Sequence, residues 1–160
     1  AISSVGEVTM AAQPSFLANL TSRACNAVGD GGGGSIWYST DGTDAWTAIF
    51  DQNADFDDDG TFKAPVTGRY LVGAFIDIQG ITSGMTYSEV RLVTSNRSYY
   101  AYIGQAGDVA TSVGDNMSMG GSVIADMDAC DVFTITTQIH GGAKVADINA
   151  TTFMWAMLEA

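Results

Sequence analysis

The sequence predicts an all-β sandwich, and three observations support this fold class. Lys and Arg together number only 6 among 160 residues, whereas the exposed faces of helices usually carry many such side chains. Thr, Ser, Tyr, Val and Ile are plentiful, and these residues favour strands. The chain also contains 19 glycines, which together with Asp separate short strand-like segments. This spacing predicts roughly eight to ten antiparallel strands.

The first half of the chain is expected to hold short strands separated by polar loops. A first strand is predicted over residues 15–20. The four consecutive glycines of 31–34 indicate a flexible loop, because glycine loses much conformational freedom in regular structure. Two more short strands are predicted at 36–38 and 46–50, and an acidic loop follows at 53–60.

The second half continues the pattern with longer strands. Over residues 70–78, apolar side chains occupy both alternating sets of positions, which predicts a central strand covered on both faces. Residues 87–94 alternate and lead through a hairpin into a strand at 97–103. Residues 105–116 are rich in Gly, Ser and Asp and predict a loop. The remaining strand candidates are 117–125, 131–139 and 151–158.

The charge balance excludes several classes of partner. The chain has 18 acidic and 6 basic residues, a formal net charge of −12. Nucleic acid is not an expected partner, because phosphate-backbone binding requires an electropositive surface. The same charge disfavours anionic membrane surfaces, and no apolar stretch approaches the ~20 residues of a spanning helix, so no membrane insertion is expected. Residues 1–10 lack the basic region of a signal peptide.

One segment carries a family resemblance. Residues 56–71, FDDDGTFKAPVTGRYL, resemble the Gly-x-Phe-x-Ala-Pro-x-x-Gly-x-Tyr pattern of the globular head of complement component C1q, which belongs to the wider tumour-necrosis-factor-like group. Residues 118–125 and the aromatic-rich segment 152–158 resemble late strands of that family. The resemblance implies a homotrimeric C1q/TNF-like jelly roll over residues 14–160, with residues 1–13 as an N-terminal arm or linker.

Finer details are most similar to the C1q-type domains of phage and bacterial fibre or virion proteins. These details are FDQN at 50–53, APVTGRY at 64–70 and VTSNRSY at 93–99. There are also departures from the family pattern. The chain shows no Gly-X-Y stalk, and Cys130 stands where many members carry Gly before Asp. These departures count against a complement-type role more than against the fold.

The sharpest chemical feature is a run of carboxylates. Asp55, Asp57 and Asp59, followed by Gly60, match the first half of a calcium loop, in which alternate carboxylates supply hard oxygen ligands. The twelfth position of such a loop would be Val66 in place of the bidentate Glu. The calcium hypothesis therefore stands beside the alternative of a solvated acidic loop.

The residues offer little for catalysis. His140 is the only histidine, whereas a zinc site needs three or four ligands. No Gly-x-Ser-x-Gly elbow is present, and carboxylates for glycoside hydrolysis occur only in loop-like clusters. Catalytic and cofactor-binding residues are therefore not expected. Cys25 and Cys130 could form one disulfide or stay as two free thiols, and the sequence leaves both alternatives open.

The aromatic residues have two interpretations. Trp46 and Tyr100 are expected in the core or in a subunit interface, whereas other exposed Tyr and Trp side chains would suit a sugar- or protein-binding surface. Both alternating sets of side chains in the segment 153–158 are apolar. Only one set can face the core, so the other set must be covered by something else. A subunit interface is the natural cover. Phe153, Trp155 and Met157 are therefore the predicted trimer interface.

Together these observations predict a non-enzymatic trimeric structural and recognition domain. We expect a virion or extracellular location, as a fibre head or capsid decoration that assembles with itself, with other virion proteins, or with a host-surface glycan or protein. The predicted recognition loops are 29–34, 51–59 and 105–116. The alternatives are a secreted complement-like recognition or adhesion domain, a cement protein without a ligand, and a hydrolase that uses the acidic loop.

Overall fold

The computed structural model describes residues 12–28, 46–82, 84–105, 116–141 and 146–159. Within these residues, twelve strands form two antiparallel sheets. In chain order they are β1 (Ser15–Leu20), β2 (Ala24–Val28), β3 (Trp46–Asp51), β4 (Phe56–Asp57), β5 (Thr61–Lys63), β6 (Gly68–Gln79), β7 (Tyr87–Thr94), β8 (Ser98–Gln105), β9 (Asn116–Met127), β10 (Val132–His140), β11 (Ala146–Ile148) and β12 (Phe153–Leu158). The described residues contain no helix that is long and apolar enough to span a membrane.

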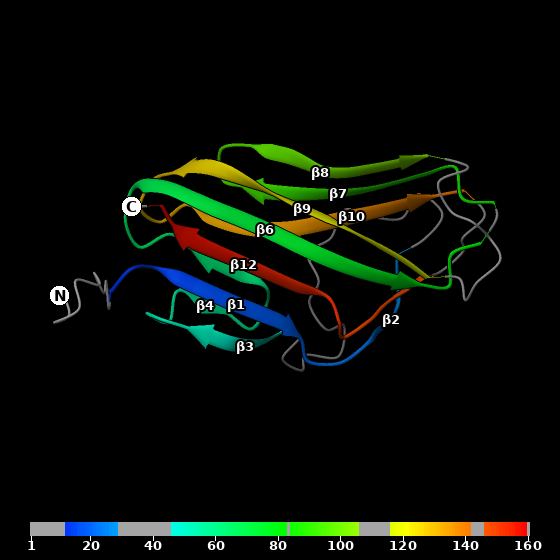
Figure 1. The fold of residues 1–160 in the computed structure, drawn as a ribbon, viewed down its shortest axis with the longest axis horizontal. Helices are drawn as coiled ribbons and strands as arrows, with labels where there is room; N and C mark the ends of the chain where they lie inside the picture. The colour runs from blue at the N-terminus through cyan, green and yellow to red at the C-terminus, as the bar shows by residue number, and fades with distance from the viewer. Residues whose placement is uncertain (1–11, 29–45, 83, 106–115, 142–145, 160) are drawn as a thin grey trace, which may run out of the picture.

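The larger sheet has seven strands, with β6 at its centre. Its order is β2-β11-β6-β12-β1-β3, and β9 pairs with the other edge of β6. β9 follows β6 over its full length, whereas β12 and then β11 share the opposite edge. Figure 1 shows β6, β12 and β1 running side by side. The predicted central place of 70–78 is confirmed, because β6 is paired along both edges, and the core covers one of its two faces.

The smaller sheet has the order β4-β5-β10-β7-β8, and the core lies between the two sheets. Ring contacts connect them. Phe62 of β5 lies 5.7 Å from Tyr70 of β6, measured between ring centroids, and Phe16 of β1 stacks on Phe56 of β4 at 4.3 Å. All four side chains are buried. Burying an aromatic or large aliphatic side chain stabilises a fold by about 1.5–3 kcal/mol, so this layer anchors the sandwich.

The segment with the C1q-like pattern forms β5, the following turn and the start of β6. Phe62 and Ala64 are fully buried, and the hydroxyl of buried Tyr70 donates a hydrogen bond of 2.8 Å to the Val66 carbonyl. This bond closes the turn that precedes β6. A side chain at Gly68 would meet Leu158 Cδ1 at 2.5 Å, so the pattern's second glycine lets β12 end against β6.

The acidic segment is more regular than the predicted loop. Phe56 and Asp57 form β4, which pairs with β5, and the intervening turn is closed by Gly60 N donating to Asp57 O at 3.0 Å. Gly60 has a φ of +87°, and a Cβ there would lie 2.6 Å from Trp46 Nε1. Glycine is therefore required on both counts. Trp46 is 2% exposed, which confirms its predicted place in the core.

Most predicted strands appear with small shifts in their bounds. Four short strands were not predicted: β2 and β11, which pair with each other beside the end of β6, and β4 and β5, which pair with each other in the acidic segment. Each is too short to show a period in the sequence. The predicted strand at 36–38 and the glycine loop lie outside the described residues. The twelve described strands also exceed the expected eight to ten, because β2, β4, β5 and β11 are short additions.

Candidate functional site

The outward side of the larger sheet is apolar. Alternation along β12 buries Met154 and Ala156 in the core and turns Phe153, Trp155 and Met157 to the opposite side. These are the three residues predicted as the trimer interface. The structure places all three on one face, away from the core.

Neighbouring strands extend this face in register. Trp155 lies between Leu17 of β1 and Gly73 of β6, and Met157 lies opposite Leu71. Across β6, Leu71 lies opposite Ile124 of β9. We call this surface the aromatic face and define it by Leu17, Leu71, Phe75, Ile124, Phe153, Trp155 and Met157.

Three aromatic rings form the centre of the aromatic face. Phe75 and Phe153 stack with centroids 5.1 Å apart and planes at 20°, and Phe153 lies 5.7 Å from Trp155. Toward the sides, Ile124 is 54% and Met157 41% exposed. A contiguous apolar surface with large exposed side chains is typical of an interaction site. The sequence could have revealed Leu71 and Phe75, because they belong to the alternate set of apolar residues in the predicted central strand, the set that does not face the core.

Polar groups border the aromatic face at the end of β6. The Asp77 carboxylate accepts hydrogen bonds from Ser118 Oγ at 3.3 Å, Asn149 Nδ2 at 3.2 Å and Thr151 Oγ1 at 2.5 Å. These bonds tie β6 to β9 and to the turn before β12. An apolar centre with a polar rim is the usual anatomy of a protein interface.

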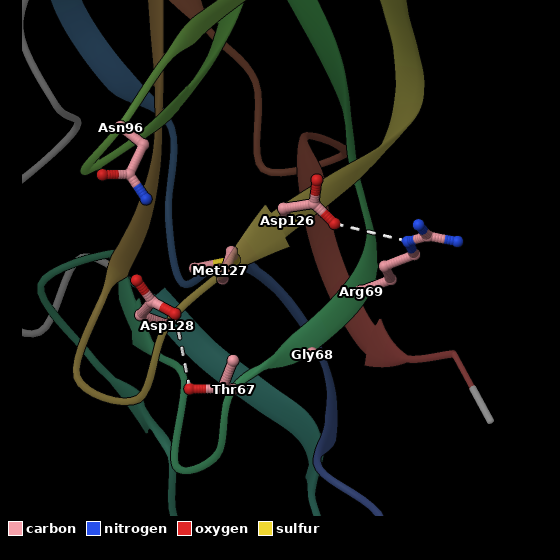
Figure 2. Close-up of a pocket in the computed structure, with 7 residues that line it drawn as sticks. All are labelled: Thr67, Gly68, Arg69, Asn96, Asp126, Met127 and Asp128. Carbon is pink, nitrogen blue, oxygen red and sulfur yellow. Dashed lines mark hydrogen bonds and ion pairs between the residues drawn. The ribbon is translucent and has the colours of Figure 1, made fainter.

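A second feature is an open pocket of about 380 Å³ at one end of the sandwich. Figure 2 shows Arg69 directed toward Asp126 and Thr67 toward Asp128, with Nε to Oδ1 at 3.3 Å and Oγ1 to Oδ1 at 3.5 Å. The Arg69 and Asp126 side chains are 75% and 87% exposed. Solvent therefore screens these charges, and the lining residues offer no buried, activated group for catalysis. The pocket is lined by Thr67, Gly68, Arg69, Asn96, Asp126, Met127 and Asp128.

The three predicted calcium ligands occupy a hairpin. Asp57 lies in β4, and Asp59 Oδ1 accepts a hydrogen bond from Thr61 N at 2.9 Å. Asp55 is partly buried, and its Oδ2 has no hydrogen-bond partner. Burial raises the pKa of the Asp55 carboxyl, and the nearby Asp51 carboxylate raises it further. Among the described residues, no group of three or more His, Cys, Asp or Glu side chains could hold a metal ion. Calcium binding stays a prediction.

The other predicted residues are dispersed over the molecule. Cys25 and Cys130 are both exposed and free. Tyr100 is 54% exposed on the smaller sheet, so of the two places expected for it, the core or a subunit interface, the structure excludes the core, and it lies on the sheet opposite the aromatic face. Sequence alternation could not place it, because the pairing of β7 with β8 shifts register between Val90 and Arg91. Of the predicted recognition loops, 29–34 and most of 105–116 lie outside the described residues.

Comparison with known proteins identifies the fold. No family model and no curated protein matches the chain. Among solved structures, the globular domain of zebrafish complement 1qA protein is similar at a TM-score of 0.57 and 14% identity, over 92% of this chain and 98% of that one. Murine APRIL, crystallised at pH 5.0, is similar at a TM-score of 0.55 and 12% identity, over 92% and 99%.

These similarities establish an all-β jelly roll of the C1q/TNF type. The fold expectation that the sequence pattern implied is confirmed. At these identities the comparison extends to the fold alone, and function rests on the chain's own surfaces.

Proposed function

We propose that the chain is a non-enzymatic recognition and structural domain that assembles as a homotrimer through the aromatic face. The observation that carries this proposal is the contiguous apolar surface of β1, β6, β9 and β12. Such a surface is costly to leave in water, and burial contributes about 25 cal/mol per Å² of apolar area. A second copy of the same chain can cover this apolar surface without any other protein.

A closed ring of three copies is the assembly that we propose. In a cyclic trimer, each copy uses one surface to meet a different surface of the next, and the ring then closes. The aromatic face supplies the first of these surfaces, and its polar border around Asp77 sets the rim. The jelly-roll likeness to complement and APRIL domains supports this arrangement.

The setting we propose is a virion or extracellular fibre head, or a capsid decoration, that mediates assembly and host-surface contact. The support is the similarity of 50–53, 64–70 and 93–99 to fibre and virion domains. Other virion proteins or a host-surface glycan or protein would then be partners. A secreted complement-like recognition domain is the alternative with the same fold. Three copies of each binding surface would strengthen weak contacts through avidity.

Analytical ultracentrifugation of two matched variants tests the trimer. Ile124→Glu places a charge in the proposed interface, whereas Ile103→Glu makes the same change at a residue of the smaller sheet with similar exposure, 50% against 54%. We expect a species of three chain masses for the natural sequence and for Ile103→Glu, and a monomer for Ile124→Glu, because burying an unpaired charge is costly. A monomeric natural sequence, or a trimer that tolerates Ile124→Glu, would contradict the proposal.

A further inference from the structure

The outward face of the smaller sheet carries a second organised surface, far from the aromatic face. Strands β10, β7 and β8 lie side by side there, and their outward residues align in rows. Gln138 lies opposite Glu89, and His140 lies opposite Tyr87. Arg91 lies opposite Tyr100. We call this surface the outer platform and define it by Tyr87, Glu89, Arg91, Tyr100, Gln138 and His140.

Glu89 is the centre of the outer platform. It lies on the outward side of the sheet, yet it is only 2% exposed. Its carboxylate accepts a hydrogen bond from the Tyr87 hydroxyl at one oxygen and pairs with Arg91 Nη2 at 2.6 Å at the other. A buried carboxylate held from both sides has a fixed position and orients the residues around it.

The two partners of Glu89, Arg91 and Tyr87, each contact the ring of another residue. The Arg91 guanidinium lies 4.7 Å from the centroid of the Tyr100 ring, a cation–π distance. Tyr87 meets His140 edge to face, with centroids 5.6 Å apart. His140 Nε2 in turn lies 3.5 Å from Gln138 Oε1. The platform is therefore a preorganised set of planar polar groups, beside which Tyr100 exposes 54% of its surface.

The charge and shape of the platform select the chemistry of its ligand. Glu89 and Arg91 neutralise one another, so the surface offers no net charge to an ionic partner. A saccharide presents hydroxyls that both donate and accept, and a C–H face that packs on an aromatic ring. Hydrogen bonds from such hydroxyls to charged groups are roughly twice as strong as those between neutral groups. We infer that the outer platform binds a neutral saccharide, with Tyr100 as its stacking ring and Arg91 and Gln138 as hydrogen-bonding groups.

A protein partner suits this surface less well. Protein hot spots usually insert a side chain into a desolvated pocket. None of the residues that line the described pocket belongs to the platform. The planar polar groups of the platform and the exposed Tyr100 ring, with the exposed Ile103 opposite Glu89 beside them, fit a sugar ring better than an inserted side chain.

Tyr100→Ala and Val66→Ala form the matched pair for a test on a printed array of neutral and acidic oligosaccharides. Both residues are exposed, at 54% and 46%, but Val66 lies in the turn before β6 and outside the platform. We expect the natural sequence and Val66→Ala to bind neutral oligosaccharides, and Tyr100→Ala to bind about tenfold more weakly, as for loss of a single hot-spot ring. Arg91→Lys, which keeps the charge but loses the planar fork, should weaken binding as well.

Several results would overturn the inference. These are no binding to neutral glycans, binding to acidic glycans only, or equal binding by Tyr100→Ala. Binding to a desialylated glycoprotein that survives enzymatic removal of its glycans would assign the surface to a polypeptide instead. Titration of an array-positive soluble oligosaccharide into monomeric Ile124→Glu separates this inference from the trimer, because each chain carries a complete platform.

Discussion

The indole ring of Trp155 lies over Gly73, so that a Cβ at residue 73 would be 2.2 Å from Trp155 Cζ2 and 2.5 Å from Cε2. The two residues are direct partners in the pairing of β12 with β6. The missing side chain of Gly73 is what allows the ring to lie down on the sheet. The close approach of the Trp155 ring to β6 therefore depends on a glycine in the middle of the central strand of the aromatic face.

The first prediction follows from this contact. Gly73→Ala should lift the Trp155 ring from the sheet and roughen the aromatic face. We expect overpacking to cost the fold about 1–3 kcal/mol and to weaken trimer assembly about tenfold or more. Sedimentation over a concentration series measures the second effect, and thermal unfolding measures the first.

Gly120→Ala is the companion variant for this test. A Cβ at Gly120 would lie 2.1 Å from the Ala74 carbonyl oxygen, which is backbone and cannot turn away as a ring can. We expect Gly120→Ala to lower the Tm more than Gly73→Ala. The opposite ranking, or Gly73→Ala trimers of unchanged affinity, would show that the Trp155 ring does not set the interface.

The second prediction concerns the pH dependence of stability at Asp55. Burial, together with the neighbouring Asp51, raises its folded pKa above the ordinary value of 3.8. The folded state therefore prefers the protonated form, and this contribution is present below pH 3.8 and is lost as the pH rises through the folded pKa. Asp55→Asn should raise the Tm at pH 7 by about 2 °C, a small shift because solvent screens a partly exposed group. The gain should disappear near pH 3, and an equal gain at both pH values would contradict it.

The third prediction tests calcium binding at Asp55, Asp57 and Asp59, which the structure does not bring together as a ready group of metal ligands, so that binding would have to rearrange the hairpin. A cation at this hairpin would relieve the repulsion between Asp55 and Asp51, so millimolar calcium should raise the Tm of the natural sequence. Asp55→Asn should respond less. Magnesium at the same ionic strength is the control for general screening. An unchanged Tm in calcium would identify the segment as a solvated hairpin.

The fourth prediction concerns the two cysteines. Cys130 donates its backbone N–H to Ala64 just before β6 begins, whereas Cys25 lies in β2, next to Ala24, which pairs with Ile148 opposite the end of β6. The length of β6 separates them by about 30 Å, and a disulfide needs Cα atoms within about 7 Å. Both thiols should react with a thiol reagent in the native protein. Intact mass should be the same with and without reductant, and a 2 Da difference would contradict free thiols.

The fold could be predicted where a strand is long enough to show a clear pattern of apolar side chains. Residues 70–78 show apolar side chains on both parities, and β6 indeed has the core on one side and the aromatic face on the other. Phe153, Trp155 and Met157 could be assigned to one face from alternation alone. What alternation cannot supply is the identity of the sheet neighbours, so Leu17 and Ile124 enter the aromatic face only through the strand order.

The outer platform shows where sequence reasoning stops. Tyr87, Glu89 and Arg91 alternate as an exposed strand face would, and nothing in that pattern indicates that Glu89 is buried. Its hydrogen-bond and ion-pair partners, Tyr87 and Arg91, lie on the same strand, and only the sheet pairing shows that Gln138 and Ile103 lie opposite it on the two neighbouring strands. The sequence leaves Tyr100 either in the core or in a subunit interface, and the register shift in the pairing of β7 with β8 turns it outward.

The pairing of Ser15 with Met157 gives the molecule a polarity. β1 begins and β12 ends at the same pole, on the left in Figure 1, so a shaft or carrier joined directly to either strand would be attached at that pole. The Arg69–Asp126 pocket lies at that pole too, since β6 begins and β9 ends there. A particle attached at this pole would cover the pocket and leave the flanks, the outward faces of the two sheets, free. The outer platform lies on such a flank, so a tethered trimer would meet a surface side-on as well as tip-first.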